Sequence, residues 1–264
     1  MKLIPKKSLG QNFLRAPAIA RVIAETACPL GNETVLEIGP GEGALTDELL
    51  KCAKKVVAVE KDARLIEILQ KKYAQEIRNK KLALSLSDIL SHSPEKFIRA
   101  KEYVVAANIP YYITGAIIKH LLSAKNKPKR VVFLVQKEVA WRIAARKGRP
   151  FNSARGKESV LSISVKVYGT PRIVRVVPAG AFYPRPKVDS AIIVIENIQN
   201  PFRKKTGEEK FFKILKCGFA HKRKLLRRNL GVTGETLALC GIQKDTRPET
   251  LSEKQWLCLS KKIG

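Results

Sequence analysis

The amino-acid sequence predicts an α/β fold in which a doubly wound parallel sheet precedes a smaller, basic helical region. Three observations support this prediction: short Val- and Leu-rich runs alternate with segments of helical period, a glycine-rich stretch follows the first run, and strand signals end near residue 197. Apolar runs without polar alternation are typical of strands buried on both faces, as in parallel sheets. Repeated strand–helix units of this kind connect through right-handed crossovers.

Five strands are expected in the first half of the chain, in the sequences ETVLEI, KVVAVE, KLALSL, YVVAAN and RVVFLVQ. The segments between them have the period of amphipathic helices, as in DARLIEILQKKYAQ. In that helix Asp62 is the expected N-cap, while Leu65, Ile66 and Leu69 share one face.

The second half begins with a polar, basic loop, RKGRPFNSARGK. Further strands are expected at residues 160–167, 173–177 and 190–196. Beyond these no strand signal remains, and the segments around residues 211–230 and 249–263 have helical patterns. The sequence therefore predicts two domains, residues 1–197 with the sheet and residues 198–264 with basic helices.

The charge balance of the chain is strongly basic. Its 264 residues include 51 Lys and Arg against 23 Asp and Glu, a formal net charge of +28. Such an excess implies a polyanionic partner, and nucleic acid is the leading candidate because neutralised phosphates release counterions. A membrane surface is the rival, but no apolar run approaches the roughly 18 residues of a membrane span. The N-terminal sequence MKLIPKKSLGQNFL lacks an apolar signal core, so a cytoplasmic location is expected.

The cysteines indicate a reducing environment and no metal site. There are five of them, an odd number, and none has C-x-x-C spacing: Cys28, Cys52, Cys217, Cys240 and Cys258. This pattern argues against a disulfide framework and against a zinc site. The three histidines form no ligand spacing with the cysteines, so no metal is expected.

A glycine-rich loop is the first candidate site. The stretch VLEIGPGEGALTDEL places Gly39, Gly41 and Gly43 between the first strand and the next helix. Glycines there allow a ligand to approach the backbone, and a helix N-terminus favours negative groups. Glu60 ends the second strand, where a carboxylate can accept hydrogen bonds from ribose hydroxyls. A cofactor that contains a nucleoside is therefore expected.

Two acidic residues indicate which cofactor this is. The loop also satisfies the G-x-G-x-x-G/A fingerprint of dinucleotide sites, so a nicotinamide cofactor and an oxidoreductase remain an alternative. Glu37, however, places a carboxylate just before the loop, which suits the sulfonium and ammonium groups of S-adenosylmethionine better than a pyrophosphate. Asp88 follows the third strand, where it either accepts a hydrogen bond from an adenine amino group or caps a helix.

The fourth strand ends in Asn108-Ile109-Pro110-Tyr111, at the same edge of the sheet as the glycine loop. An exocyclic adenine amine is a poor nucleophile because its lone pair is delocalised into the ring. The Asn108 side-chain oxygen and the Ile109 carbonyl can accept both amine hydrogens, which favours a pyramidal nitrogen with its lone pair aimed at a methyl group. Pro110 stiffens the turn, and Tyr111 offers a ring on which an extruded base can stack. The alternative is a simple strand-ending turn.

With these motifs the chain resembles the ribosomal RNA adenine N6-dimethyltransferase family over nearly its whole length. KKSLGQNFL resembles the family's N-terminal motif, EIGPGEG its cofactor loop, NIPY its catalytic motif and VPAGAFYPRPKVDSA its late motif. The resemblance implies a Rossmann-like, S-adenosylmethionine-dependent methyltransferase sheet with a reversed last strand and a small helical C-terminal domain. It also implies that Asn12 and Leu14 touch the cofactor and that Phe182 packs on the target base opposite Tyr111.

Within the family, LGQNFL and VDSA are more similar to the branch that dimethylates two adjacent adenosines near the 3′ end of small-subunit ribosomal RNA. The resemblance thus implies the immature small ribosomal subunit as partner, and a monomeric enzyme is expected. Two alternatives remain open. The macrolide-resistance branch, which acts on large-subunit RNA, shares NIPY and the P-x-P-K-V element. A mainly non-catalytic ribosome-assembly factor would also suit the basic C-terminal region.

Two basic segments are expected to contact RNA phosphates, which position the RNA without selecting the base. The first lies in FAHKRKLLRRNL and contains Lys222, Arg223, Lys224, Arg227 and Arg228. The second is the long basic loop with Arg146, Lys147 and Arg149. A solvated charged face is the alternative for the first segment.

Overall fold

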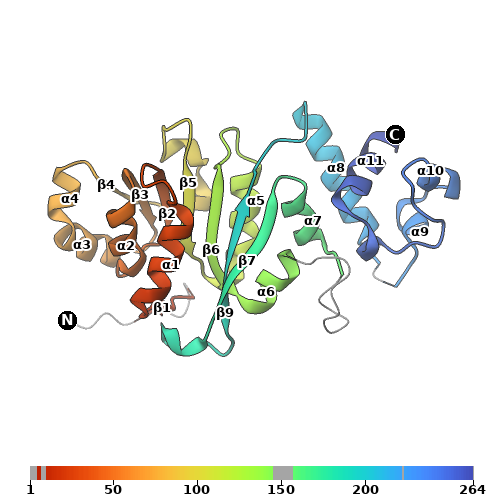
Figure 1. Cartoon of the computed structure of the whole chain (residues 1–264). Coiled ribbons are helices and arrows are strands. Elements are labelled where there is room, and N and C mark those ends of the chain that lie inside the picture. Colours follow the sequence, from red (N-terminus) through yellow and green to blue (C-terminus); the bar gives the residue numbers. More distant parts are fainter. Residues whose placement is uncertain (1–4, 7–9, 145–156, 222, 264) are drawn as a thin grey trace. The chain divides into compact units, whose positions relative to one another are not determined.

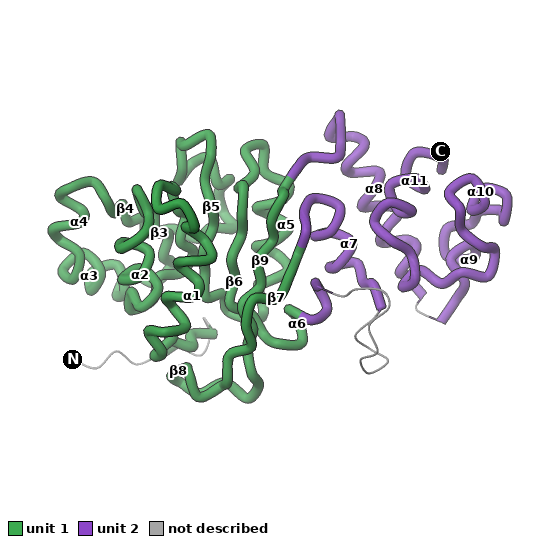
Figure 2. The backbone as a smooth tube through the Cα atoms, in the orientation of Figure 1, with its two compact units in different colours: residues 1–140, 171–198 green, residues 141–170, 199–264 purple. Residues whose placement is uncertain are grey.

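The computed structural model describes residues 5–6, 10–144, 157–221 and 223–263. The chain folds into two compact units (Figure 2). The first comprises Met1–Ala140 and Pro171–Ile198, and the second comprises Trp141–Thr170 and Gln199–Gly264. One boundary between the units thus follows Ile198. The second unit also contains residues 141–170, so it is formed by two separate stretches of the chain. The functional roles expected for the two predicted domains stay predictions.

The first unit is built on a seven-stranded sheet with the order β4-β3-β2-β5-β6-β9-β7 (Figure 1). Its strands are β2 (Thr34–Ile38), β3 (Lys55–Glu60), β4 (Leu82–Leu86), β5 (Val104–Asn108), β6 (Arg130–Gln136), β7 (Thr170–Val177) and β9 (Ser190–Glu196). The first five strands pair in parallel, whereas β9 runs antiparallel to β6. The predicted α/β class and the reversed strand implied by the family resemblance are confirmed.

The helices of this unit follow the strands in the predicted alternation. They are α1 (Pro17–Ala27), α2 (Ala44–Cys52), α3 (Ala63–Lys72), α4 (Ala74–Arg78), α5 (Thr114–Leu122) and α6 (Lys137–Ile143), the last of which ends in the second unit. Short 3₁₀ turns are η2 (Ile89–Ser91), η3 (Pro94–Lys96), η4 (Tyr111–Ile113) and η5 (Ala179–Ala181). In α3 the prediction is confirmed, because the Asp62 side chain caps Arg64 N and the three expected apolar residues are buried.

The core of the first unit explains why its strands lack polar alternation. Val35, Val104 and Val132 pack in one cluster with Ile23 of α1 and Leu49 of α2. On each of these three strands, β2, β5 and β6, the residue that follows the valine along the strand is buried as well. Because successive residues point to opposite faces, both faces of the sheet are covered. Among the interior residues of β2, β5 and β6, Glu37 is the exception, a buried carboxylate one residue before the end of β2.

A second, two-stranded sheet ties the N-terminal segment to the late motif. Strand β1 (Phe13–Leu14) pairs antiparallel with β8 (Phe182–Tyr183). In the register Phe13 lies opposite Tyr183 and Leu14 lies opposite Phe182. Two segments that the sequence identified as separate motifs are therefore joined by backbone hydrogen bonds.

The second unit is helical in the part that the structure describes. Its elements are α7 (Val160–Lys166), α8 (Lys205–Gly218), α9 (Leu226–Leu230), α10 (Gly234–Ala238), η6 (Pro248–Thr250) and α11 (Glu253–Lys262). The strand predicted at residues 160–167 is wrong. Ser159 and Ser162 form a capping box that starts a helix there, which overrides the β-branched composition of the segment.

The helical pattern expected around residues 211–230 is divided between two helices. Helix α8 ends at Gly218, where a Cβ atom would lie 2.3 Å from Trp256. The Asn229 amide then donates to the carbonyls of Gly218 and His221, at 2.6 and 3.1 Å, and closes the turn before α9. Arg223 and Lys224 therefore lie in a turn and not on a helix.

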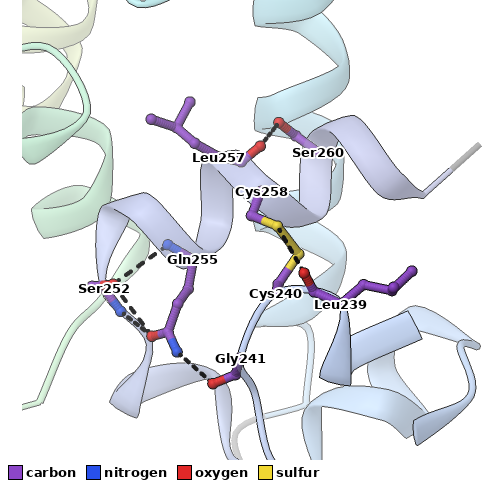
Figure 3. Close-up of a disulfide and its surroundings, with 8 residues drawn as sticks. All are labelled: Leu239, Cys240, Gly241, Ser252, Gln255, Leu257, Cys258 and Ser260. Carbon is purple, nitrogen blue, oxygen red and sulfur yellow. Dashed lines mark hydrogen bonds between the residues drawn. A yellow bond between two sulfur atoms is a disulfide. The ribbon is translucent and has the colours of Figure 1, made fainter. Parts of the chain in front are cut away.

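The prediction of unpaired cysteines is wrong for Cys240 and Cys258, which form a disulfide (Figure 3). Cys240 follows α10 and Cys258 lies in α11, and their Cα atoms are 5.7 Å apart. The fold brings the two helices together, a proximity that a separation of 18 residues in the sequence does not reveal. Cys28, Cys52 and Cys217 are free.

Candidate active site

A cavity opens at the carboxyl edge of the sheet in the first unit, where parallel α/β sheets bind ligands. Five segments contribute to its wall, comprising residues 10–14, 38–42, 59–61, 87–89 and 108–113. Of the predicted cofactor and catalytic residues, this wall contains Asn12, Leu14, Gly39, Gly41, Glu60, Asp88, Asn108, Ile109, Pro110 and Tyr111. It does not contain Glu37, Gly43 or Phe182.

The glycine loop is shaped by left-handed backbone conformations. Gly39 and Gly41 have φ angles of +67° and +60°, which residues with a Cβ atom rarely adopt. A Cβ atom at Gly39 would meet no atom within 4 Å and would project into open space, whereas one at Gly41 would lie 3.1 Å from the Phe13 ring. The loop therefore exposes backbone at the cavity wall.

The glycine at position 43 is explained by the packing of helix α2. It is the N-cap of α2 with a φ angle of +89°, and a Cβ atom there would lie 2.3 Å from the Tyr73 hydroxyl. That hydroxyl lies 2.8 Å from the Gly43 carbonyl oxygen and 2.7 Å from Asp47 Oδ1. Gly43 thus allows α2 to begin against Tyr73.

Glu60 connects the second strand to the glycine loop. Its carboxylate accepts hydrogen bonds from the backbone N–H groups of Gly41, Lys61 and Asp62, at 3.2, 2.8 and 2.9 Å. Burial raises the pKa of Glu60 above its ordinary value, while these hydrogen bonds oppose the rise. The carboxylate is held rigidly at the end of β3, and its remaining lone pairs can accept hydrogen bonds from ligand hydroxyls.

Asp88 caps a turn, as one of its two predicted roles requires, and its contact with an adenine amino group stays a prediction. Its Oδ1 accepts from Leu90 N at 2.9 Å and caps η2, while the residue also lines the cavity. Lys61, which sequence reasoning missed, lies 2.7 Å from Oδ2. The hydrogen bond from Lys61 lowers the pKa of Asp88, so the carboxylate stays ionised beside the cavity.

Glu37 lies behind the glycine loop. Its side chain is fully buried, and Oε2 accepts a 2.8 Å hydrogen bond from Thr46 Oγ1. Its Oε1 has no hydrogen-bond partner among the described residues. Burial raises the pKa of Glu37 to about 8. The structure does not bring this carboxylate to the cavity wall, so its contact with a cationic cofactor stays a prediction.

The Asn108 side chain has a defined orientation. Its Nδ2 donates a 3.0 Å hydrogen bond to the main-chain carbonyl of Asn12. A carbonyl only accepts hydrogen bonds, so the amide nitrogen must face Asn12, and Oδ1 is the end left to accept hydrogen bonds from a ligand. The adjacent turn is fixed because Ile109 N donates to the Leu134 carbonyl at 3.2 Å.

The aromatic residues named by the sequence differ in their burial. Tyr111 lines the cavity, and its hydroxyl lies 2.7 Å from Ser190 Oγ. Phe182 is buried and belongs to the hydrophobic core cluster. Its contact with a target base opposite Tyr111 stays a prediction. Tyr112 lines the cavity and is 66 % exposed.

Asp62 holds the N-terminal segment that forms one wall of the cavity. Gln11 Nε2 donates to Asp62 Oδ2 at 3.2 Å, and Lys6 Nζ lies 3.5 Å from Oδ1. Arg64 also binds this buried carboxylate, which lowers the pKa of Asp62. Sequence reasoning missed Gln11 and Phe13 as wall residues. Phe13 carried no signal because an apolar side chain in a cavity has the same pattern as one in the core.

The predicted RNA contacts are only partly covered by the structure. Lys222, Arg146, Lys147 and Arg149 lie outside the described residues. In the second unit Arg223, Lys224 and Arg228 are exposed, which is compatible with phosphate contact. Arg227 is half-buried, and its Nε lies in the interior without a described hydrogen-bond partner.

The described part of the chain contains neither a metal-binding cluster nor a membrane-spanning helix. No group of three or more His, Cys, Asp or Glu side chains is arranged there to hold a metal ion. No helix in the same part is long and apolar enough to cross a lipid bilayer.

Sequence comparison identifies similar proteins along nearly the whole chain. The profile of the family described as "Ribosomal RNA adenine dimethylase" matches residues 4–263. "Ribosomal RNA small subunit methyltransferase A" of Dehalococcoides mccartyi strain CBDB1 is 41 % identical over 96 % of this chain and 87 % of its own length. The protein of the same name from Moorella thermoacetica is 36 % identical over 99 % of this chain and 93 % of its own.

Solved structures agree with these matches. A dimethyladenosine transferase from Plasmodium falciparum is 28 % identical with a TM-score of 0.75, over 94 % of this chain and 95 % of that one. The 23S rRNA methyltransferase ErmE is 26 % identical with a TM-score of 0.73, over 96 % and 99 % of the two chains. Both similarities extend over nearly the whole of this chain.

Proposed function

This chain belongs to the ribosomal RNA adenine dimethylase family, and we propose that it transfers methyl groups from S-adenosylmethionine to N6 of two adjacent adenosines near the 3′ end of small-subunit ribosomal RNA. The product is N6,N6-dimethyladenosine, formed in the cytoplasm on the immature small subunit by a monomeric enzyme. The single observation that carries the chemistry is the orientation of the Asn108 amide, whose Nδ2 is engaged by the Asn12 carbonyl.

S-adenosylmethionine supplies an electrophilic methyl group when it is bound. The cavity fits this cofactor because it combines exposed backbone at Gly39 and Gly41 with two carboxylates at neighbouring strand ends. In the proposed arrangement Glu60 accepts hydrogen bonds from the ribose hydroxyls and Asp88 from the adenine amino group. Asn12 and Leu14 close the cavity from the N-terminal side.

Asn108 and Ile109 act on the target amine. Oδ1 of Asn108 accepts one N–H hydrogen and the Ile109 carbonyl accepts the other, so the nitrogen lone pair is withdrawn from the ring and aimed at the methyl group. These acceptors are preorganised, since the Asn12 carbonyl and the Leu134 carbonyl hold the two residues in place. The methylated amine is cationic and sheds its proton without a dedicated general base.

Tyr111 provides the ring on which the extruded adenine stacks. The basic residues of the C-terminal region position the RNA through its phosphates, which we infer from the exposure of Arg223, Lys224 and Arg228 and from the net charge of +28. The small-subunit branch is favoured over the macrolide-resistance branch because the small-subunit relatives are 36–41 % identical, whereas ErmE is 26 % identical.

The Asn108→Ala variant tests this chemistry. Without the side-chain acceptor we expect methyl transfer to fall by about 100-fold or more, since preorganised groups in active sites have effects of this size. S-adenosylmethionine binding, measured by calorimetry, and RNA binding should stay within about threefold. Asn32→Ala, in the exposed loop before β2, is the matched control. Full methylation by Asn108→Ala would contradict the proposal.

The assembly-factor alternative is tested by methyl transfer in the wild-type protein. A protein that only binds the particle would show no methyl transfer in its wild-type form either, while its RNA affinity would be unaffected by Asn108→Ala.

A further inference from the structure

The two-stranded sheet assigns different positions to the two aromatic residues of the late motif. Successive residues in a strand point to opposite faces, and directly opposite residues of antiparallel strands share a face. Phe182 lies opposite Leu14, which also lines the cavity, and both side chains are buried in the hydrophobic core. Tyr183 lies opposite Phe13, which lines the cavity, and Tyr183 is 53 % exposed. The accessible aromatic ring of the motif is therefore Tyr183.

A cation is held over this ring. The guanidinium carbon of Arg15 lies 5.8 Å from the centroid of Tyr183, within the range of a cation–π contact. Arg15 is anchored at both ends, because its Nη2 lies 2.7 Å from Glu42 Oε2 and its backbone N donates to the Ala181 carbonyl at 2.8 Å. Glu42 belongs to the cavity wall. The ring and the cation are thus fixed at the border of the cavity before any ligand binds.

The surroundings of Tyr183 are basic. Arg185 and Lys187 follow it and are exposed. Asp189, the acidic residue of this loop, is paired with Lys137 at 3.2 Å and accepts from Ala179 N at 3.2 Å. An exposed ring among arginine and lysine side chains combines the two elements of single-stranded nucleic-acid sites, a stacking surface and phosphate-binding cations.

We propose that Tyr183 and Arg15 form a binding site for the nucleotide adjacent to the target adenosine, with the base stacked on the tyrosine ring and its phosphate on the guanidinium. This inference rests on the proposed function, since it requires an RNA substrate. The occupant is a neighbour and not the target base, because Tyr183 lies outside the cavity wall whereas Asn108 and Tyr111 are part of it. Extrusion of the target base leaves its neighbour without a stacking partner, and Tyr183 replaces that partner.

Kinetics with undermethylated small subunits test the proposal on the full-length enzyme. We expect Tyr183→Leu to raise KM for the subunit about tenfold, the effect of losing one stacked base. Tyr183→Phe, which keeps the ring, should stay within about twofold of the wild type. Arg15→Gln should weaken subunit binding and reduce its salt dependence. Tm and the Kd for S-adenosylmethionine should not change in these variants.

Two controls separate this role from a structural one. Leu30→Ala removes an exposed apolar side chain that is distant in sequence from the late motif. The KM of this variant for the small subunit should equal that of the wild type. Phe133→Leu, at a fully buried ring in β6 outside the cavity wall, should lower Tm with little effect on KM. Wild-type KM for Tyr183→Leu, or a KM that rises only together with lost S-adenosylmethionine binding, would overturn the proposal.

The proposed function itself can fail separately. If the wild-type enzyme methylates no ribosomal RNA, the methyltransferase assignment falls. If it methylates the RNA and Tyr183→Leu does so with the same KM, only the nucleotide site at Tyr183 is refuted.

Discussion

The hydroxyl of Tyr111 lies 2.7 Å from Ser190 Oγ and joins the turn after β5 to the antiparallel strand β9. Ser190 is fully buried at the start of β9, where it pairs with Gln136 of β6. This hydrogen bond connects residues 79 positions apart and fixes the direction of the Tyr111 ring at the cavity wall. Ser190 is therefore a positioning residue for the ring on which the target base is proposed to stack.

Removal of this hydrogen bond should slow catalysis without affecting the cofactor. We expect Ser190→Ala and Tyr111→Phe each to lower kcat about three- to tenfold, equivalent to a net hydrogen bond of roughly 1 kcal/mol. The KM for S-adenosylmethionine should not change. The double variant should be no slower than either single variant, because both remove the same interaction. Ser164→Ala, whose hydroxyl donates to the Val160 carbonyl, is the control; additive losses in the double variant would contradict this role of Ser190.

Glu37 should make the ligand-free protein less stable as the pH rises. Burial raises its pKa from an ordinary value of 4.5 to about 8, so between these values the folded state binds more protons than the unfolded chain. The free energy of unfolding therefore falls across this window and levels off above it. Glu37→Gln removes the effect, so the stability of the variant relative to the wild type should increase from pH 4.5 to 8 in urea titrations. A difference independent of pH would refute the raised pKa.

The disulfide should stabilise the second unit. It closes a loop of 18 residues, for which chain entropy gives about 3 kcal/mol in the free energy of unfolding. Reduction with dithiothreitol, or the Cys240→Ser variant, should lower Tm accordingly. Cys217→Ser, which changes an exposed free thiol, should leave Tm and its response to reductant unchanged. An identical Tm with and without reductant would show that the bond contributes nothing.

The exposed basic residues of the turn and of α9 should contribute to RNA affinity. Replacement of Arg223, Lys224 and Arg228 by Gln should weaken RNA binding and reduce the slope of log Kd against log salt by roughly 0.7–0.9 for each phosphate that is no longer neutralised. S-adenosylmethionine binding should persist. The matched control replaces three exposed lysines before strands of the first unit, namely Lys54, Lys101 and Lys125. Equal slopes for the two triple variants would argue against phosphate binding by the turn.

The sheet could be predicted from sequence because its determinants are local. Strands β3, β5, β6 and β9 have uninterrupted apolar interiors, and Asp62 caps α3 through the nearby Arg64 N–H. The error at residues 160–167 arose where a capping box outweighed β-branched residues. The disulfide could not be predicted, because it depends on how α10 and α11 pack and not on the spacing of the cysteines.

The site was predictable only in part, for a related reason. Glycines and acidic residues at strand ends carry a pattern, so Gly39, Gly41, Glu60 and Asp88 could be placed at one edge. The partners that orient the catalytic side chains come from distant segments, as Asn12 does for Asn108 across 96 positions. No local pattern identifies such partners.

The most direct test of the proposed chemistry uses methyl-labelled S-adenosylmethionine with undermethylated small and large ribosomal subunits, followed by digestion to nucleosides. We expect label in N6,N6-dimethyladenosine from the small subunit alone, and its loss with Asn108→Ala. Label in large-subunit RNA would assign the chain to the macrolide-resistance branch. No label from either subunit, with RNA binding retained, would contradict the central claim that this cavity transfers methyl groups to adenosine.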